Sequence, residues 1–208
     1  MTGGSALAGK ISRPAKPRKS RIDKPRAGGY AFLIMDLDLG PGARVLVDSS
    51  ALVYLVEGVP RRGPAVSAFL DRVRSGGGRP FASVLAMTEL LERPLSRGDR
   101  DLAARYRRFL ADSSLLVLVP VDAEVAETAA RILGEGTFDP RSRRLPGLRP
   151  GDPGSSRFGV SFADAVHLAT ARVHGAEAIL TNDEAWRDVP EAPPVYLVDE
   201  VAAELEWS

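Results

Sequence analysis

Short apolar runs alternate with amphipathic stretches along the chain from Arg44 onward. Runs such as Val45–Val47 and Ala178–Leu180 are apolar throughout, which is typical of strands buried on both faces of a sheet. Between these runs, segments such as Arg62–Arg74 carry apolar residues three and four positions apart, the spacing of one helix face. Strands separated by helices predict an α/β protein with a central, mainly parallel sheet that helices flank in three layers.

The same pattern places the individual elements. The predicted strands are Val45–Val47, Pro80–Ala82, Leu115–Val119, Ala178–Leu180 and Val195–Val198. The predicted helices are Ser49–Val56, Arg62–Arg74, Val84–Glu92, Asp99–Leu110, Ala123–Leu133, Phe162–His174 and Asp199–Glu206. We expect Pro94 to end the third helix, because proline lacks the N–H that a helix interior needs. Asp122 is a good N-cap for the fifth helix.

Charge and composition divide the chain into regions. Residues 1–29 hold eight Lys or Arg against one acid, a net charge of +7, and they contain all four lysines. Residues 30–208 hold 20 Arg against 26 acids, a net charge of −6. We therefore predict a basic, disordered tail and linker over residues 1–43 and one folded domain over residues 44–208. Residues 135–159, rich in Pro and Gly, are expected to form an irregular surface insertion.

Several classes of protein are disfavoured by composition. The 208 residues include no cysteine, so disulfides and thiolate metal sites are excluded. No apolar run is long enough to span a bilayer, and the N-terminal residues lack the pattern of a secretory signal. The sequence therefore predicts a cytoplasmic protein that has no membrane segment.

Four acidic residues occupy positions where α/β proteins bind ligands. Asp48 ends the first predicted strand, and Asp183 follows a later one. Glu89 lies on the helix after the second strand, and Asp164 lies in the first turn of its helix. Because ligands bind outside the carboxyl ends of parallel strands, we expect these four side chains to converge on one edge of the sheet.

Each acid also has a purely structural interpretation. Asp48 could cap the helix that follows it, and Asp183 could form a local turn. Glu89 could pair with Arg93 one turn later, and Asp164 could form a capping box with the serine three residues before it. Three of the four acids nevertheless lie at strand ends or helix starts, where loops carry chemistry, and this favours a functional site.

Clustered carboxylates suit one kind of chemistry in particular. They repel one another unless a cation neutralises them, and oxygen ligands favour hard ions such as Mg²⁺ or Mn²⁺. Such an ion can activate water and polarise a phosphodiester, so no side-chain nucleophile is required. The pattern therefore points to a metal-dependent hydrolase acting on phosphodiester bonds.

Four segments of the sequence resemble one known family. They are VLVDSSALVYL (45–55), SVLAMTELLERP (83–94), FADAVHLATA (162–171) and ILTNDEAW (179–186). Together they resemble the acidic motifs of the PIN-domain family, and within it the VapC-type toxin ribonucleases of bacterial toxin–antitoxin pairs. The resemblance covers residues 44–198, and its glutamate motif is the least specific of the four.

The resemblance implies an Mg²⁺- or Mn²⁺-dependent endoribonuclease, a homodimer and a cognate antitoxin that blocks the site. The residues that match the family's acids and supporting hydroxyls are Asp48, Glu89, Asp164, Asp183, Ser50 and Thr181. Glu92, one turn after Glu89, could be the ligand in its place. The basic tail and the 135–159 insertion depart from the compact pattern of the family.

Two other functions are compatible with the sequence. Phe32–Leu39 resembles the nucleophile motif of haloacid-dehalogenase-type phosphatases, in which Asp36 would attack a phosphomonoester, but no lysine follows Lys24. Alternatively, the chain could be a PIN-like module that binds RNA or a partner without cutting it.

His167 and His174 share a helix face, but no further residues at zinc-ligand spacing accompany them.

Overall fold

Five parallel strands form the centre of the domain, as the hydrophobic pattern predicted. A computed structural model describes residues 39–137 and 160–206, all within one compact unit, Ala31–Ser208. The strands are β1 (Arg44–Val47), β2 (Arg79–Ser83), β3 (Val117–Val119), β4 (Ala178–Thr181) and β5 (Val195–Leu197). Their order is β3-β2-β1-β4-β5 and every neighbouring pair is parallel, so all five carboxyl ends lie at one edge of the sheet.

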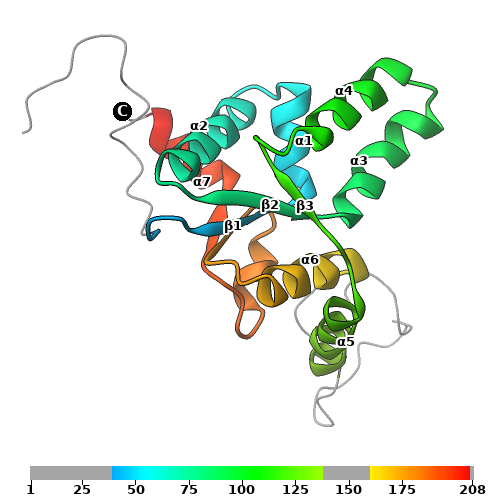
Figure 1. Cartoon of the computed structure of the whole chain (residues 1–208), viewed down its shortest axis with the longest axis vertical. Helices are drawn as coiled ribbons and strands as arrows, with labels where there is room; N and C mark the ends of the chain where they lie inside the picture. The colour runs from blue at the N-terminus through cyan, green and yellow to red at the C-terminus, as the bar shows by residue number, and fades with distance from the viewer. Residues whose placement is uncertain (1–38, 138–159, 207–208) are drawn as a thin grey trace, which may run out of the picture. The chain divides into compact units, whose positions relative to one another are not determined.

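Helices cover both faces of this sheet. Those described are α1 (Ser49–Glu57), α2 (Arg62–Ser75), α3 (Leu85–Ser96), α4 (Arg100–Ala111), α5 (Ala123–Thr137), α6 (Phe162–Val173) and α7 (Val198–Glu206), with a 3-10 helix, η2 (Glu184–Asp188). Figure 1 shows α1, α2 and α4 on one side of the strands and α5 and α6 on the other. The predicted three-layer α/β architecture is therefore confirmed.

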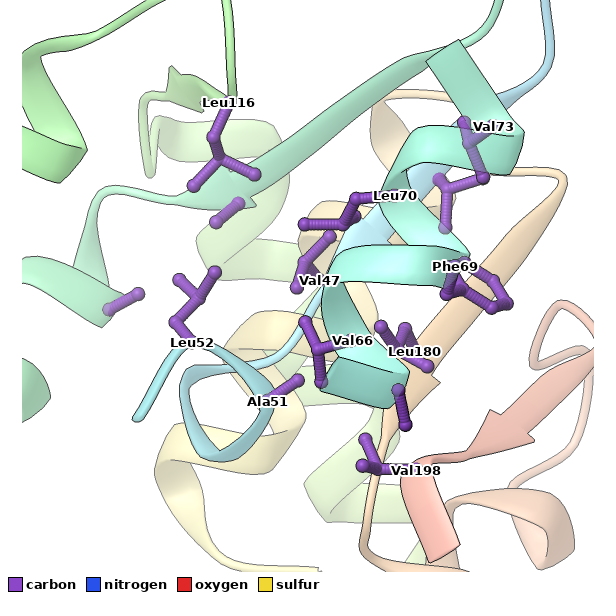
Figure 2. Packing of buried hydrophobic residues seen from close by; sticks show 14 of the residues in the cluster. Val47, Ala51, Leu52, Val66, Phe69, Leu70, Val73, Leu116, Leu180 and Val198 are labelled. Atoms are coloured by element: carbon purple, nitrogen blue, oxygen red, sulfur yellow. The ribbon is translucent and has the colours of Figure 1, made fainter. Parts of the chain in front are cut away.

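Alternate residues of the strands supply two separate cores. Val45, Val47 and Leu180 point to the face covered by α1, α2 and α7, whereas Leu46 and Ile179 point to the face covered by α5 and α6. Figure 2 shows α2 lying against the strands, with its apolar residues directed at β1 and β4. Burial on both faces explains why the strand sequences are apolar throughout instead of alternating.

Three predicted boundaries differ from the structure by two residues or more. Pro94 lies inside α3, which continues to Ser96 and ends with the N–H of Gly98 bonded to the carbonyl of Leu95. Strand β3 begins only at Val117, because the N–H groups of the two preceding leucines bond to the carbonyl of Asp112 in a turn. Helix α5 extends beyond its predicted end to Thr137, into the segment expected to be irregular.

Some predictions fall on residues that the structure does not describe. Residues 1–38, which include the basic tail and Asp36, and residues 138–159 of the expected insertion lie outside the described residues. Within the part that is described, no helix has the length and apolar character needed to cross a membrane.

Candidate functional site

The four predicted acids lie near the carboxyl edge of the sheet, two of them just after strands and two in the first or second turn of a helix. Asp48 comes directly after β1, and Asp183 comes two residues after the end of β4. Glu89 lies in the second turn of α3, which follows β2, and Asp164 lies in the first turn of α6. The parallel sheet thus brings segments far apart in the sequence to one edge.

Asp48 is a buried carboxylate that does not cap its helix. It occupies the N-cap position of α1, but its side chain makes no capping hydrogen bond. Instead, its Oδ2 accepts hydrogen bonds from Ser50 Oγ at 2.6 Å and from Thr181 Oγ1 at 2.8 Å. The side chain is 6% exposed. Because β1 pairs Val47 with Leu180 of β4, the next residues of the two strands, Asp48 and Thr181, necessarily lie side by side.

Glu89 pairs with a histidine on the opposite side of the sheet edge. Its Oε2 lies 2.7 Å from Nε2 of His167, so the expected pairing with Arg93 is replaced by one between α3 and α6. Burial alone would raise the pKa of the Glu89 carboxyl, but the hydrogen bond and charge of His167, with a hydrogen bond from Ser49, leave that pKa below its ordinary value. Glu89 therefore stays ionised in the folded chain.

Asp164 forms the capping box that its structural interpretation predicted, and Asp183, for which a local turn was expected, bonds to the backbone two residues on and caps η2. Oδ2 of Asp164 accepts a hydrogen bond from the N–H of Ser161 at 2.7 Å in a complete capping box. Oδ1 of Asp183 accepts from the N–H of Ala185 at 2.9 Å and caps η2. Each carboxylate uses only one oxygen in these hydrogen bonds within the described part of the chain, so capping leaves the second oxygen of each for a ligand.

The charges of three of the acids act on the pKa of His167. Burial would lower the pKa of His167, but its hydrogen bond to Glu89 and the negative charges of Asp48, Glu89 and Asp164 raise that pKa above its ordinary value. Asp183 is connected more indirectly, because its N–H donates to Thr181 Oγ1 at 3.1 Å and that hydroxyl donates to Asp48. The charges of Asp48, Glu89 and Asp164 thus all favour the protonated imidazole, and Glu89 is hydrogen-bonded to it.

The carboxylates nevertheless do not form a ready-made metal site. Among residues 39–137 and 160–206, no three acidic or histidine side chains are close enough together to hold a metal ion. The donors are carboxylate and hydroxyl oxygens, which suit a hard divalent cation. Such an ion would have to draw the carboxylates closer together than they lie in this structure.

The sequence did not reveal the partner of His167, a polar residue of this edge. His167 was noted as sharing a helix face with His174, but its pairing with Glu89 joins residues 78 positions apart, and no local pattern reveals such a contact. Ser50 and Thr181, in contrast, lie where the motif spacing predicted and both donate to Asp48. Glu92 is exposed, whereas Glu89 faces His167.

A parallel α/β fold with acidic side chains at the carboxyl edge of its sheet is typical of proteins that bind a ligand at that edge. Comparison with known families identifies which of these proteins the chain resembles. The family model for the PIN domain matches residues 45–192. The chain therefore belongs to the PIN-domain family. No curated protein matches the chain significantly.

Solved structures share the fold at low sequence identity. A chain of the VapBC2 complex from Rickettsia felis, solved with a DNA fragment from its promoter, matches with a TM-score of 0.53 and 14% identity, covering 74% of this chain and 98% of that chain. A chain of the DNA-bound VapBC complex from Salmonella typhimurium matches with a TM-score of 0.51 and 14% identity, covering 75% and 98%. These matches show that the fold is shared with proteins of those complexes.

Proposed function

We propose that this chain is a divalent-metal-dependent endoribonuclease that hydrolyses RNA phosphodiesters, and that it acts as the toxin of a type II toxin–antitoxin pair. The observation that carries the proposal is the state of Asp48. A carboxylate at an N-cap position ordinarily accepts from the helix backbone, but this one is buried and held by the hydroxyls of Ser50 and Thr181 instead. Membership of the PIN-domain family supports the same conclusion.

In this proposal, Asp48, Glu89, Asp164 and Asp183 bind Mg²⁺ or Mn²⁺. When bound, the ion activates water and stabilises negative charge on the phosphodiester. Ser50 and Thr181 hold Oδ2 of Asp48, so its side chain loses little entropy when the ion binds. Oδ1, which accepts a long hydrogen bond of 3.4 Å from Ser49 Oγ, is the oxygen proposed to bind the ion. Glu89 is the proposed ligand in preference to Glu92, because Glu92 is exposed, whereas Glu89 is half-buried and hydrogen-bonded to His167 at the carboxyl edge of the sheet.

The experiment is cleavage of labelled, mixed-sequence RNA by the purified full chain in Mg²⁺, in Mn²⁺ and in excess chelator. Asp48→Asn should lower the rate by about 100-fold or more, the scale on which loss of a preorganised electrostatic group slows an enzyme. Asp71→Asn is the matched control, because Asp71 is an exposed carboxylate of α2 that pairs with Arg74. Equal cleavage by Asp48→Asn, or undiminished cleavage in chelator, would refute the proposal.

The toxin assignment and the partner depend on the structural neighbours. The two similar chains come from VapBC complexes solved with DNA, and we propose by analogy a cognate antitoxin, a homodimer and action in the cytoplasm. Induced expression in a bacterial host tests the toxin assignment. Growth arrest with RNA loss is expected for the wild type and not for Asp164→Asn, whereas equal growth of the two would remove the toxin role and leave a nuclease of another kind.

One observation favours a second candidate function. The described residues hold no ready-made group of three metal ligands, as expected for a PIN-like module that binds RNA or a partner without cutting it. Mn²⁺ binding without turnover on any RNA would support this module. Hydrolysis of a phosphomonoester that depends on Asp36 would instead support the phosphatase alternative.

A further inference from the structure

His167 is the most buried ionisable side chain at the carboxyl edge of the sheet among the described residues. It lies in the middle of α6 and is 1% exposed. Its Nε2 lies 2.7 Å from Oε2 of Glu89, whose side chain is 32% exposed. The contact therefore joins an immobile ring to a carboxylate that still reaches solvent, and it bridges α3 and α6.

The ring is held by the same segments that carry the other acids. It stacks on Trp186, with ring centroids 6.2 Å apart and an interplanar angle of 25°. Trp186 is fully buried and belongs to η2, which Asp183 caps. Asp164 lies one turn before His167 on α6. The position of the imidazole is thus fixed by packing, and its contact restrains Glu89, a half-buried side chain that also accepts a hydrogen bond from Ser49.

We propose that His167 is a positioning residue that donates from Nε2 to Glu89 and orients its carboxylate for the divalent cation. The inference rests on the proposed function, because it requires Glu89 to be a ligand. One oxygen, Oε2, is occupied by the imidazole, and the other is then presented to the ion. Outer-shell hydrogen bonds of this kind fix ligand geometry, and their loss reduces metal affinity about 10- to 100-fold.

Three variants of the full chain separate this role from packing. His167→Phe keeps an aromatic ring against Trp186 but removes the donor, so the dissociation constant for Mn²⁺, measured by calorimetry, should rise about 10- to 100-fold. His167→Gln places an amide N–H near the position of Nε2 and should restore affinity to within about threefold of the wild type, because the donor is what matters. Phe69→Leu disturbs buried packing in the core on the other face of the sheet, so it should lower the melting temperature without changing the dissociation constant for Mn²⁺.

A double-mutant cycle tests the route of the effect. In a Glu89→Gln background, His167→Phe should cause no further loss of Mn²⁺ affinity, because the ligand that His167 orients is already gone. Additive losses would overturn the proposal and assign His167 a structural role. If His167→Phe does not fold, the Nε2–H signal of wild-type His167 in NMR spectra is measured instead. This signal should shift as Mg²⁺ is added. A signal that does not move in the Mg²⁺-bound protein would overturn the proposal.

Failure of this inference differs from failure of the proposed function. If the wild type binds Mn²⁺ and cleaves RNA, and Asp48→Asn abolishes cleavage while His167→Phe changes neither Mn²⁺ affinity nor rate, only the role of His167 is refuted. If the wild type binds no Mn²⁺ and cleaves no RNA, both are refuted.

Discussion

The hydroxyl of Thr181 offers a direct measure of how strongly the fold holds the central carboxylate. Thr181 is fully buried and donates to Asp48 at 2.8 Å, and its oxygen also accepts from the N–H of Asp183. Replacing it by valine conserves shape and strand propensity but removes both hydrogen bonds. A hydrogen bond to a charged group contributes about 1.5–3 kcal/mol. Thr181→Val should therefore destabilise the fold by about 2 kcal/mol.

Thr170→Val is the matched control for this measurement. Thr170 is equally buried, but its hydroxyl donates at 2.7 Å to the neutral carbonyl of Val166 on its own helix. Its loss should cost about 1 kcal/mol or less. Urea unfolding at neutral pH in chelator gives both free energies, and the melting temperature of Thr181→Val should fall by roughly 4–8 °C. Equal losses for the two variants, or an undiminished loss for Thr181→Val in an Asp48→Asn background, would refute the reasoning.

Three further predictions concern the core, alkaline pH and substrate binding. Phe69→Ala should destabilise the fold by about 3–5 kcal/mol in urea unfolding, because Phe69 is fully buried in the core that α2 shares with β1 and β4. Phe162→Ala is the control and should change the free energy of unfolding by less than about 0.5 kcal/mol, because Phe162 is 69% exposed. Burial, with a hydrogen bond to Glu57, raises the pKa of Tyr106, so the unfolded chain releases this proton above pH about 10 while the folded chain retains it. The free energy of unfolding should therefore fall as the pH rises beyond about 10, and it should fall less steeply in Tyr106→Phe. An identical slope in the two proteins would contradict this prediction. RNA binding should weaken in excess chelator, because unneutralised carboxylates repel phosphate, and equal affinity with and without chelator would contradict this.

Local chemistry in the sequence was enough to predict most elements of the fold. The apolar runs of β1 and β4 and the amphipathic spacing of α2 depend on neighbours a few residues away, which a linear pattern records. The errors at the end of α3 and at the start of β3 arose from local backbone hydrogen bonds that the hydrophobic pattern does not record. Pro94, for example, lies in α3 two residues before its end because the backbone bonds of the last turn form around it.

What the sequence alone determined is which residue types stand near the carboxyl ends of the strands. They are carboxylates after β1 and β4, hydroxyls at Ser50 and Thr181, and acids in the second turn of α3 and the first turn of α6. Only the tertiary structure decided their partners. Thr181 reaches Asp48 across 133 residues through the register of β1 with β4, and His167 reaches Glu89 across 78 through the packing of α6 beside α3. Such pairs are formed by long-range packing, which no local periodicity encodes, and so the partners of Asp48 and Glu89 could be known only once the fold had brought the segments together.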